Sequence, residues 1–235
     1  MKTIAFSGGK DSTAMLLRLI EIGEKIDKIM FADTTLEFPE MYEWIKKIKL
    51  LINRKITVVK SVKSFDEWFY GIPKNGKAGK RGLIRGFPLK AYPCYWAREA
   101  KVRPMEKEQG KGNIIYLGYV INEKSRNRQK IIKNYQEGIK KEGHIYPLVD
   151  WGWTEQDCVN YLEQKGLKHP LIDRFKRTGC WLCPKQSKLS LKNLYLYYPK
   201  LWKKLKQYAR DSPQGFKPNF NFKDFENKYG KNRFD

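Results

Sequence analysis

The segment Ser-Gly-Gly-Lys-Asp-Ser at positions 7–12 combines residue types that bind phosphate. Its glycine pair follows an apolar run and precedes a run with helical spacing. Successive backbone N–H groups can therefore point at one anion, and a helix start adds a favourable dipole. Lys10 supplies positive charge, Ser12 a further hydrogen bond, and Asp11 a carboxylate that can hold Mg²⁺ or cap the helix. An ordinary turn is the alternative. The spacing is not that of the Walker loop, so γ-phosphate transfer is not implied. The predicted phosphate-binding residues are Ser7, Gly8, Gly9, Lys10, Asp11 and Ser12.

Cysteines form the second group of chemically active residues. In a reducing compartment they are poor candidates for disulfides, so Cys180 and Cys183, two residues apart, indicate metal ligands or a redox pair. Cys94 and Cys158 are candidate additional ligands. Cys158 lies at an apolar phase of residues 153–162, which favours a position in the core.

The charge balance points to a polyanionic partner. The chain has 48 Lys and Arg against 25 Asp and Glu, a formal net charge of +23. Residues 176–235 hold 15 basic and 4 acidic residues, and residues 71–92 hold basic residues and no acidic one. Such a surface concentrates nucleic acid. The alternative is that the lysines only solvate a small protein, and the placement of the charge decides between the two.

The elements that must position these residues alternate between strand and helix patterns. The run 3–6 reads as a strand and is followed by a helix, 28–32 as a second strand, 38–51 as a helix and 56–59 as a third strand. This alternation predicts the α/β class, with a doubly wound parallel sheet. Further elements are expected at 95–109 (helix), 113–120 (strand), 127–141 (helix) and 154–165 (helix).

The chain length favours one catalytic domain with appendages. We expect an α/β domain over 1–175, with a flexible basic loop at 71–92, and a basic helical arm over 176–235. Aromatic residues in the arm fall mostly at helical spacing, so they either pack the arm or stack on unpaired bases. No apolar run is long enough to span a membrane and no signal peptide is apparent, so a cytoplasmic protein is expected.

The loop at 7–12 resembles the PP-loop of ATP pyrophosphatases and sulfonucleotide reductases, which act between the α- and β-phosphates. The segment 31–40 resembles the second strand and following loop of the phosphoadenosine phosphosulfate reductase family. In that family an Asp-Thr pair lies beside the nucleotide, which implies Asp33 and Thr34 as nucleotide contacts. Capping of the next helix is the alternative role of Asp33. The likeness extends over about residues 1–190 and implies a Rossmann-like fold.

The segment 117–128 resembles the family's Gly-x-Arg-x-x-Glu-Ser-x-x-Arg motif, beginning at Gly118. Val120 stands where an arginine is usual. Arg128 matches the final arginine and is the candidate phosphate or sulfate clamp, with Arg126 a candidate substitute for the missing one. A solvated arginine pair is the alternative. His144 and His169 have no motif around them, so surface or packing roles are expected.

The cysteine segments resemble those of iron-sulfur adenylylsulfate reductases. Cys94 matches the first cysteine of a Cys-Cys pair, Tyr95 replaces the second, and Cys180 and Cys183 match a later Cys-x-x-Cys. Three of four ligands are thus present, which suits a 4Fe-4S cluster with one open iron or, as the alternative, Zn²⁺ with a fourth ligand. An open iron resembles that of iron-sulfur tRNA thiolation enzymes, where it can carry sulfide. The family's nucleophilic cysteine near the C-terminus has no counterpart after Cys183, which argues against ordinary sulfate reduction.

Three functions remain open. The leading one is a sulfur-transfer enzyme that adenylates a tRNA base or DNA backbone with ATP and Mg²⁺, with Lys10, Asp11 and Arg128 as catalytic residues and a sulfur donor protein or sulfide as a partner. The second is a divergent reductase of a small sulfonucleotide. The third is a zinc-bearing nucleic-acid binder without catalysis. No membrane partner is expected, and the sequence leaves a homodimer open.

Overall fold

The computed structural model describes residues 1–74, 81–88, 93–139 and 141–230. The chain divides into two compact units. The first contains Met1–Asp33, Pro39–Val59 and Pro104–Ile172; the second contains Thr34–Phe38, Lys60–Arg103 and Asp173–Asp235. The boundary that we expect near residue 175 lies close to the division between Ile172 and Asp173. Two earlier segments, Thr34–Phe38 and Lys60–Arg103, also belong to the second unit. Among the described residues no helix is both long and apolar enough to cross a bilayer.

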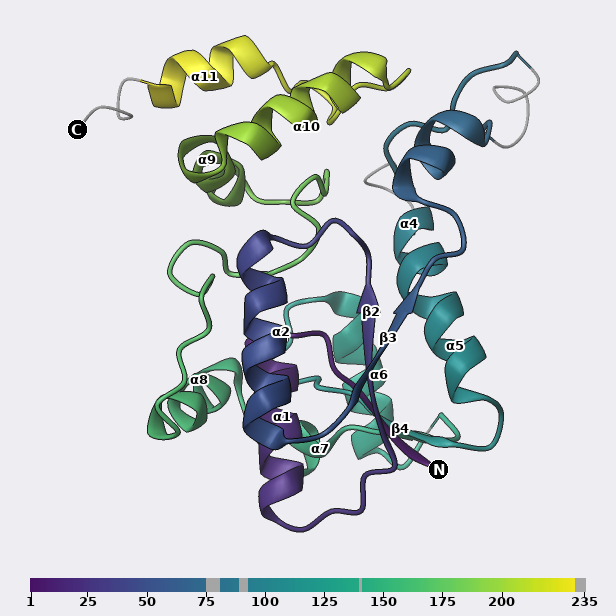
Figure 1. Ribbon diagram of the computed structural model, residues 1–235, viewed down its shortest axis with the longest axis vertical. Helices are drawn as coiled ribbons and strands as arrows, with labels where there is room; N and C mark the ends of the chain where they lie inside the picture. The colour runs from purple at the N-terminus through teal and green to yellow at the C-terminus, as the bar shows by residue number, and fades with distance from the viewer. Residues whose placement is uncertain (75–80, 89–92, 140, 231–235) are drawn as a thin grey trace. The chain divides into compact units, whose positions relative to one another are not determined.

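A five-stranded sheet forms the centre of the first unit, in the order β3-β2-β1-β4-β5. The strands are β1 (Lys2–Ala5), β2 (Lys28–Asp33), β3 (Ile56–Lys60), β4 (Ile114–Tyr116) and β5 (His144–Ile145). β1 lies between its parallel neighbours β2 and β4. Figure 1 labels β2, β3 and β4 of this sheet. From β1, the sheet therefore extends through β2 to β3 on one side and through β4 to β5 on the other. The predicted α/β class with a doubly wound parallel sheet is confirmed.

Helices that follow the strands cover the sheet because their apolar sides are buried. α1 (Lys10–Glu21) buries Ala14, Met15 and Leu16, and α2 (Pro39–Ile52) buries Trp44 and Ile48. α2 begins at a proline, which lacks the N–H that a first helical turn leaves unpaired. The later helices of this unit are α6 (Arg126–Gln136), α7 (Pro147–Asp150) and α8 (Glu155–Gln164), and α8 packs against α1. β1 and α1 thus hold the segment 7–12 between them.

Three predicted elements are shorter or less regular than expected. The strand predicted at 113–120 ends at Tyr116, and the helix predicted at 127–141 ends at Gln136, before a glycine with positive φ. Residues 95–109 form α4 (Tyr95–Ala97), a π-helical turn (Arg98–Val102) and α5 (Arg103–Gln109). Pro104 cannot donate the backbone hydrogen bond of a regular helix, which accounts for a break in the pattern nearby.

The described parts of the loop 71–92 are anchored by packing. A π-helical turn (Glu67–Gly71) precedes it, Pro73 pairs with Ile84, and Phe87 is buried. The Arg85 guanidinium lies 5.2 Å from the ring centroids of both Trp68 and Tyr95. Residues 75–80 and 89–92 of the predicted basic loop lie outside the described residues.

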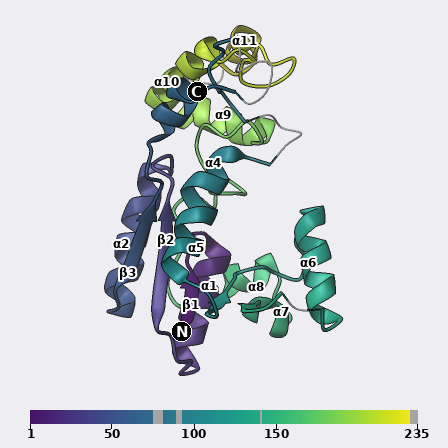
Figure 2. The same cartoon turned by 90° about the vertical axis from the view of Figure 1, so that its right-hand side faces the viewer.

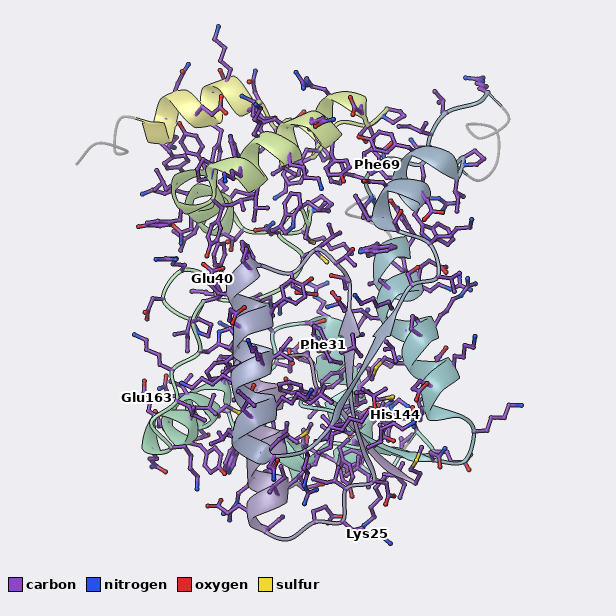
Figure 3. The ribbon with its side chains drawn as sticks, in the orientation of Figure 1. Lys25, Phe31, Glu40, Phe69, His144 and Glu163 are labelled. Atoms are coloured by element: carbon purple, nitrogen blue, oxygen red, sulfur yellow. The ribbon has the colours of Figure 1, made fainter. Side chains whose placement is uncertain are left out.

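The C-terminal arm contains α9 (Lys188–Tyr197), α10 (Pro199–Asp211) and α11 (Phe222–Gly230), which lie together in Figure 2. Trp202 stacks on Phe225 with ring centroids 5.4 Å apart, and Tyr208 packs on Phe69, which Figure 3 labels. The buried aromatic side chains of the arm therefore serve packing, which is the first of the two roles that their spacing allowed.

Candidate nucleotide and cysteine sites

The segment 7–12 forms a tight loop between β1 and α1. The Ser7 and Ser12 hydroxyls lie 2.9 Å apart, and Ser12 Oγ donates to the Gly9 carbonyl at 3.0 Å. Gly8 has φ +76°, and a Cβ there would lie 2.7 Å from Met41 Sδ. Only glycine fits this position without strain, so the sequence pattern and the observed geometry of the loop agree.

Lys10 lies among carboxylates that the sequence pattern only partly identified. Its Nζ is 2.8 Å from Asp11 Oδ1 and 3.4 Å from Glu155 Oε2. Burial acts to lower the pKa of Lys10, but attraction by Asp11 and Glu155 outweighs it and leaves the pKa above its ordinary value. Burial raises the pKa of Asp11, although Lys10 opposes the rise. Glu155 begins α8 after the Thr154 cap, so the capping box Thr154-x-x-Asp157 was the signal that could have placed it.

Gly118 brings the chain after β4 against the start of α1. A Cβ at this position would lie 3.1 Å from Ser12 Cα and 3.2 Å from its backbone nitrogen. A side chain there would collide with backbone that cannot rotate away. Gly118 therefore acts by close approach to the loop. Asp33, at the end of β2, is buried and accepts a hydrogen bond from the Tyr42 hydroxyl at 2.9 Å.

Arg128 is partly exposed and is held from two sides. Its guanidinium lies 2.6 Å from Glu123 Oε1, and 4.6 Å from the centroid of the Tyr119 ring. Burial acts to lower the pKa of Arg128, but the hydrogen bond with Glu123 raises it overall. The guanidinium therefore stays protonated. Arg126 is exposed at the start of α6. Glu123 is almost fully buried and lies within the motif that identified Arg128, but its role as the partner of Arg128 was not predicted.

His169 contacts the nucleotide loop, although only a surface or packing role was expected for it. Its Nε2 lies 3.1 Å from the Gly8 carbonyl oxygen, and its Nδ1 lies 3.3 Å from the Leu171 backbone nitrogen. Since the Leu171 N–H can only donate, Nδ1 accepts and Nε2 carries the proton that is donated to Gly8. The ring is buried and packs edge-on against Trp44. His169 thus fixes the Gly8 carbonyl by a hydrogen bond.

A matched pair of variants should separate the two hydrogen bonds of His169. Glutamine can place its amide N–H where Nε2 lies, whereas asparagine can place an acceptor where Nδ1 lies. We expect His169→Gln to bind ATP within about threefold of the wild type, and His169→Asn to bind about tenfold more weakly, because the Gly8 carbonyl loses its donor. Calorimetric titration with ATP and Mg²⁺ measures both, and equal affinities for the two variants would contradict this role.

The pH dependence of folding should carry the signature of His169. Burial, aided by the charge of Lys10 and opposed by the hydrogen bond to Gly8, lowers the pKa of His169 to about 4 from 6.5. The unfolded chain therefore takes up a proton below about pH 6.5 that the folded chain refuses. Stability should fall by up to about 3 kcal/mol as pH drops from 6.5 toward 4. Denaturant unfolding of the wild type and of His169→Gln at several pH values measures the contribution of His169 to stability. Identical pH profiles of the two proteins would contradict this contribution.

Cys180 lies in the second unit within a network of polar side chains. The Thr34 hydroxyl lies 3.5 Å from Cys180 Sγ and donates to Glu37 Oε1 at 2.8 Å, and Glu37 also pairs with Lys101 at 3.5 Å. Thr34 thus faces the cysteine segment. Burial raises the pKa of Cys180 to about 12, while Lys101 opposes the rise.

All three predicted metal ligands belong to the second unit. Cys183 interacts electrostatically with Cys94 and with Cys180. Backbone N–H groups donate to two of the sulfurs, from Ala97 to Cys94 at 3.4 Å and from Lys185 to Cys183. Burial raises the pKa of Cys183, while the bond from Lys185 opposes the rise. Thiolate is the form that binds metal. The donor chemistry therefore fits a soft metal centre, although the part of the chain that the structure describes has no group of three or more Cys, His, Asp or Glu already close enough to hold an ion.

Cys158 lies elsewhere, in the first unit. It is fully buried on α8, and burial together with the charge of Asp11 raises the pKa of its thiol well above the ordinary value. This agrees with the core position that its apolar phase predicted.

The first unit is a parallel α/β domain with a glycine loop at the first strand-to-helix turn, the type of fold that holds a nucleotide at its helix start. The family model for the phosphoadenosine phosphosulfate reductase domain matches residues 2–186. This chain therefore belongs to the phosphoadenosine phosphosulfate reductase domain family, as the sequence motifs indicated.

Individual relatives are distant. An uncharacterized protein of Methanocaldococcus jannaschii is 26% identical over 218 residues, which cover 89% of this chain and 49% of that protein. The phosphoadenosine 5'-phosphosulfate reductase of Aliivibrio salmonicida is 27% identical over 165 residues, or 68% of this chain and 58% of that enzyme. The chain thus spans about half the length of the curated relatives it matches.

Solved structures give weak similarities. A phosphoadenylyl-sulfate reductase from Candida auris matches with a TM-score of 0.49 and 17% identity, over 77% of this chain and 80% of that one. The U34-tRNA thiolase NcsA from Methanococcus maripaludis, solved with its [4Fe-4S] cluster, matches with a TM-score of 0.45 and 18% identity, over 89% of this chain and 71% of that one.

Proposed function

We propose that this protein binds ATP at residues 7–12 and cleaves it between the α- and β-phosphates to adenylate a nucleic-acid acceptor. Sulfur then replaces AMP on that acceptor. The observation that carries the proposal is the loop itself. Gly8 makes the turn with a positive φ, and Gly9 precedes α1 without a side-chain cap, so that the helix start can face an anion. Lys10 places its charge beside Asp11. Family membership supports nucleotide chemistry at this place.

The candidate site residues of the first unit would each act in the proposed first step. The acceptor oxygen attacks the α-phosphorus, a new P–O bond forms, and the bond to the β-phosphate breaks with loss of pyrophosphate. Lys10 and the loop N–H groups would offset charge on the phosphates, and Asp11, with Asp33, would hold Mg²⁺. The exposed guanidinium of Arg128 would bind the departing pyrophosphate, because Glu123 and Tyr119 hold its orientation.

The second step replaces AMP by sulfur. A nucleophilic sulfur from a donor protein or from sulfide attacks the activated atom, the bond to the adenylated oxygen breaks, and AMP leaves. Cys94, Cys180 and Cys183 would hold a 4Fe-4S cluster, or Zn²⁺ as the alternative. Such a group, when bound, supplies an electrophilic centre that binds sulfur. Lys101 lies close enough to interact with both Cys180 and Cys183, so it would stabilise their negative charge.

A nucleic-acid acceptor is proposed from charge. The net charge of +23 exceeds what solubility needs, and nearly half of the excess lies in residues 176–235. The second candidate, reduction of a small sulfonucleotide, is favoured by relatives that bear the name of that reductase.

Labelled nucleotides distinguish the two. Anaerobically purified protein is incubated with ATP labelled at the γ-phosphate, with and without bulk tRNA or duplex DNA, and pyrophosphate and phosphate are separated. Release of pyrophosphate that depends on nucleic acid is the expected result. Sulfite release from a sulfonucleotide with a thiol reductant, in the absence of pyrophosphate release from ATP, would overturn the proposal in favour of the reductase. Lys10→Ala should abolish the activity that is found.

A further inference from the structure

One side of α10 is apolar and buried, and the opposite side is basic and exposed. Trp202, Leu205 and Tyr208 are buried. The opposite side is exposed and carries four cations within a third of the helix circumference, namely Lys200, Lys203, Lys204 and Arg210. We call these four residues the α10 basic face.

The charged groups around α10 leave this face unneutralised. Lys206, on the flank of the helix, pairs with Glu226 of α11 at 2.8 Å, and Asp211 accepts a hydrogen bond from the Tyr70 hydroxyl. Within residues 1–74, 81–88, 93–139 and 141–230, no member of the α10 basic face makes an ion pair. The nearby carboxylates therefore serve internal contacts. Among the four cations, Lys204 lies over the ring of Tyr208, 5.8 Å from its centroid, which leaves its charge unneutralised.

The basic face works against the stability of its own helix. Lys200 lies three and four residues from Lys203 and Lys204, and like charges at these spacings repel. The first turn of α10 also carries no acidic residue, so its positive end meets more positive charge. Arg210, in the last turn, is favourable to the helix dipole, but folding does not account for the three lysines, whereas a bound polyanion would.

Length and composition favour a phosphodiester backbone as that polyanion. The face runs from Lys200 to Arg210, about 15 Å along the helix, which matches several successive phosphates of a nucleic-acid strand. The large aromatic side chains of α10 are buried, so no row of rings is left for bases to stack on. Tyr197 is exposed nearby, but the Arg174 guanidinium lies 4.8 Å from its ring centroid.

We infer that the α10 basic face binds the phosphate backbone of the nucleic-acid acceptor, without reading its sequence. This inference rests on the proposed function for the class of the acceptor. The face would supply affinity and orientation, whereas selection of the modified atom would fall to other residues.

The test compares two triple variants that remove equal charge. Lys200→Gln, Lys203→Gln and Lys204→Gln alter the face, and Lys46→Gln, Lys47→Gln and Lys49→Gln alter exposed lysines of α2. Fluorescence anisotropy with labelled bulk tRNA and labelled duplex DNA, at several salt concentrations and without ATP, gives affinities. We expect the α10 variant to bind at least about tenfold more weakly than the α2 variant, with a salt slope smaller by about two to three. Its unfolding midpoint should not fall.

The outcomes separate this inference from the proposed function. Equal affinities of the two triple variants would overturn the inference, and ATP cleavage by wild-type protein in the same preparation would leave the proposed chemistry standing. A wild type that binds neither probe would overturn both the inference and the nucleic-acid acceptor, while ATP binding at residues 7–12 is measured separately. If the α10 variant binds nucleic acid more weakly and its ATP binding is unchanged, the result supports the inference about the α10 basic face and not the proposed ATP chemistry.

Discussion

Gly8→Ala should abolish ATP binding and destabilise the first unit. An alanine at φ +76° adopts a left-handed conformation that L-residues disfavour by about 1 kcal/mol. Its Cβ would also lie 2.7 Å from Met41 Sδ and 3.2 Å from Ile45 Cγ1, both buried under the loop. Strain and overpacking together should cost about 2–4 kcal/mol. The loop must move to relieve them, which turns the N–H groups away from the phosphates and lowers ATP affinity by at least about a hundredfold.

Gly23→Ala is the matched control for this variant. Gly23 has φ +74°, nearly the same conformation, but nothing lies within 4 Å of a Cβ built there. It should cost only the conformational strain, about 1 kcal/mol, and leave ATP affinity unchanged. Denaturant unfolding and calorimetric titration on both variants separate strain from contact. If Gly8→Ala binds ATP as Gly23→Ala does, the loop is not the nucleotide site.

The fold was predictable because its signals are local. Apolar runs and helical spacing in residues 3–59 define strands and helices without reference to distant residues, and Gly8 permits the positive φ of the turn that the structure contains. The irregular helix at 95–109 was less predictable, since a proline is compatible with the first turn of a helix as well as with a break. Only the observed π-helical turn shows which occurred.

The partners of the site residues were not predictable from spacing alone. His169 lies 161 positions from Gly8 and Glu155 lies 145 positions from Lys10, so the contacts depend on how α8 and the chain after it pack on the loop. Thr34 illustrates the same point. Its hydroxyl bonds to Glu37 and lies 3.5 Å from Cys180, a contact across 146 positions that the motif around Asp33 does not indicate. Its place beside a nucleotide stays a prediction.

Cys180→Ala should remove the metal centre that we propose for the second unit. The Thr34 hydroxyl lies 3.5 Å from Cys180 Sγ, and Thr34 bonds in turn to Glu37, which pairs with Lys101. Loss of one thiolate from a set of three leaves too few soft ligands for a cluster or a zinc ion, so metal content should fall below about a tenth of the wild type. Elemental analysis and visible and paramagnetic resonance spectra of anaerobically purified protein measure the loss and tell iron from zinc.

Cys158→Ala provides the control, because it removes a buried thiol from the first unit and leaves the other three in place. The cavity should cost about 1–2 kcal/mol of stability without loss of metal. Retention of metal by Cys180→Ala, or its loss from Cys158→Ala, would mean that the ligand set is wrong. Metal lost from Cys180→Ala with ATP affinity unchanged would show that the cysteine site and the loop at 7–12 bind their ligands independently. Sulfur transfer would then require both sites, whereas adenylation of the acceptor would require only the loop.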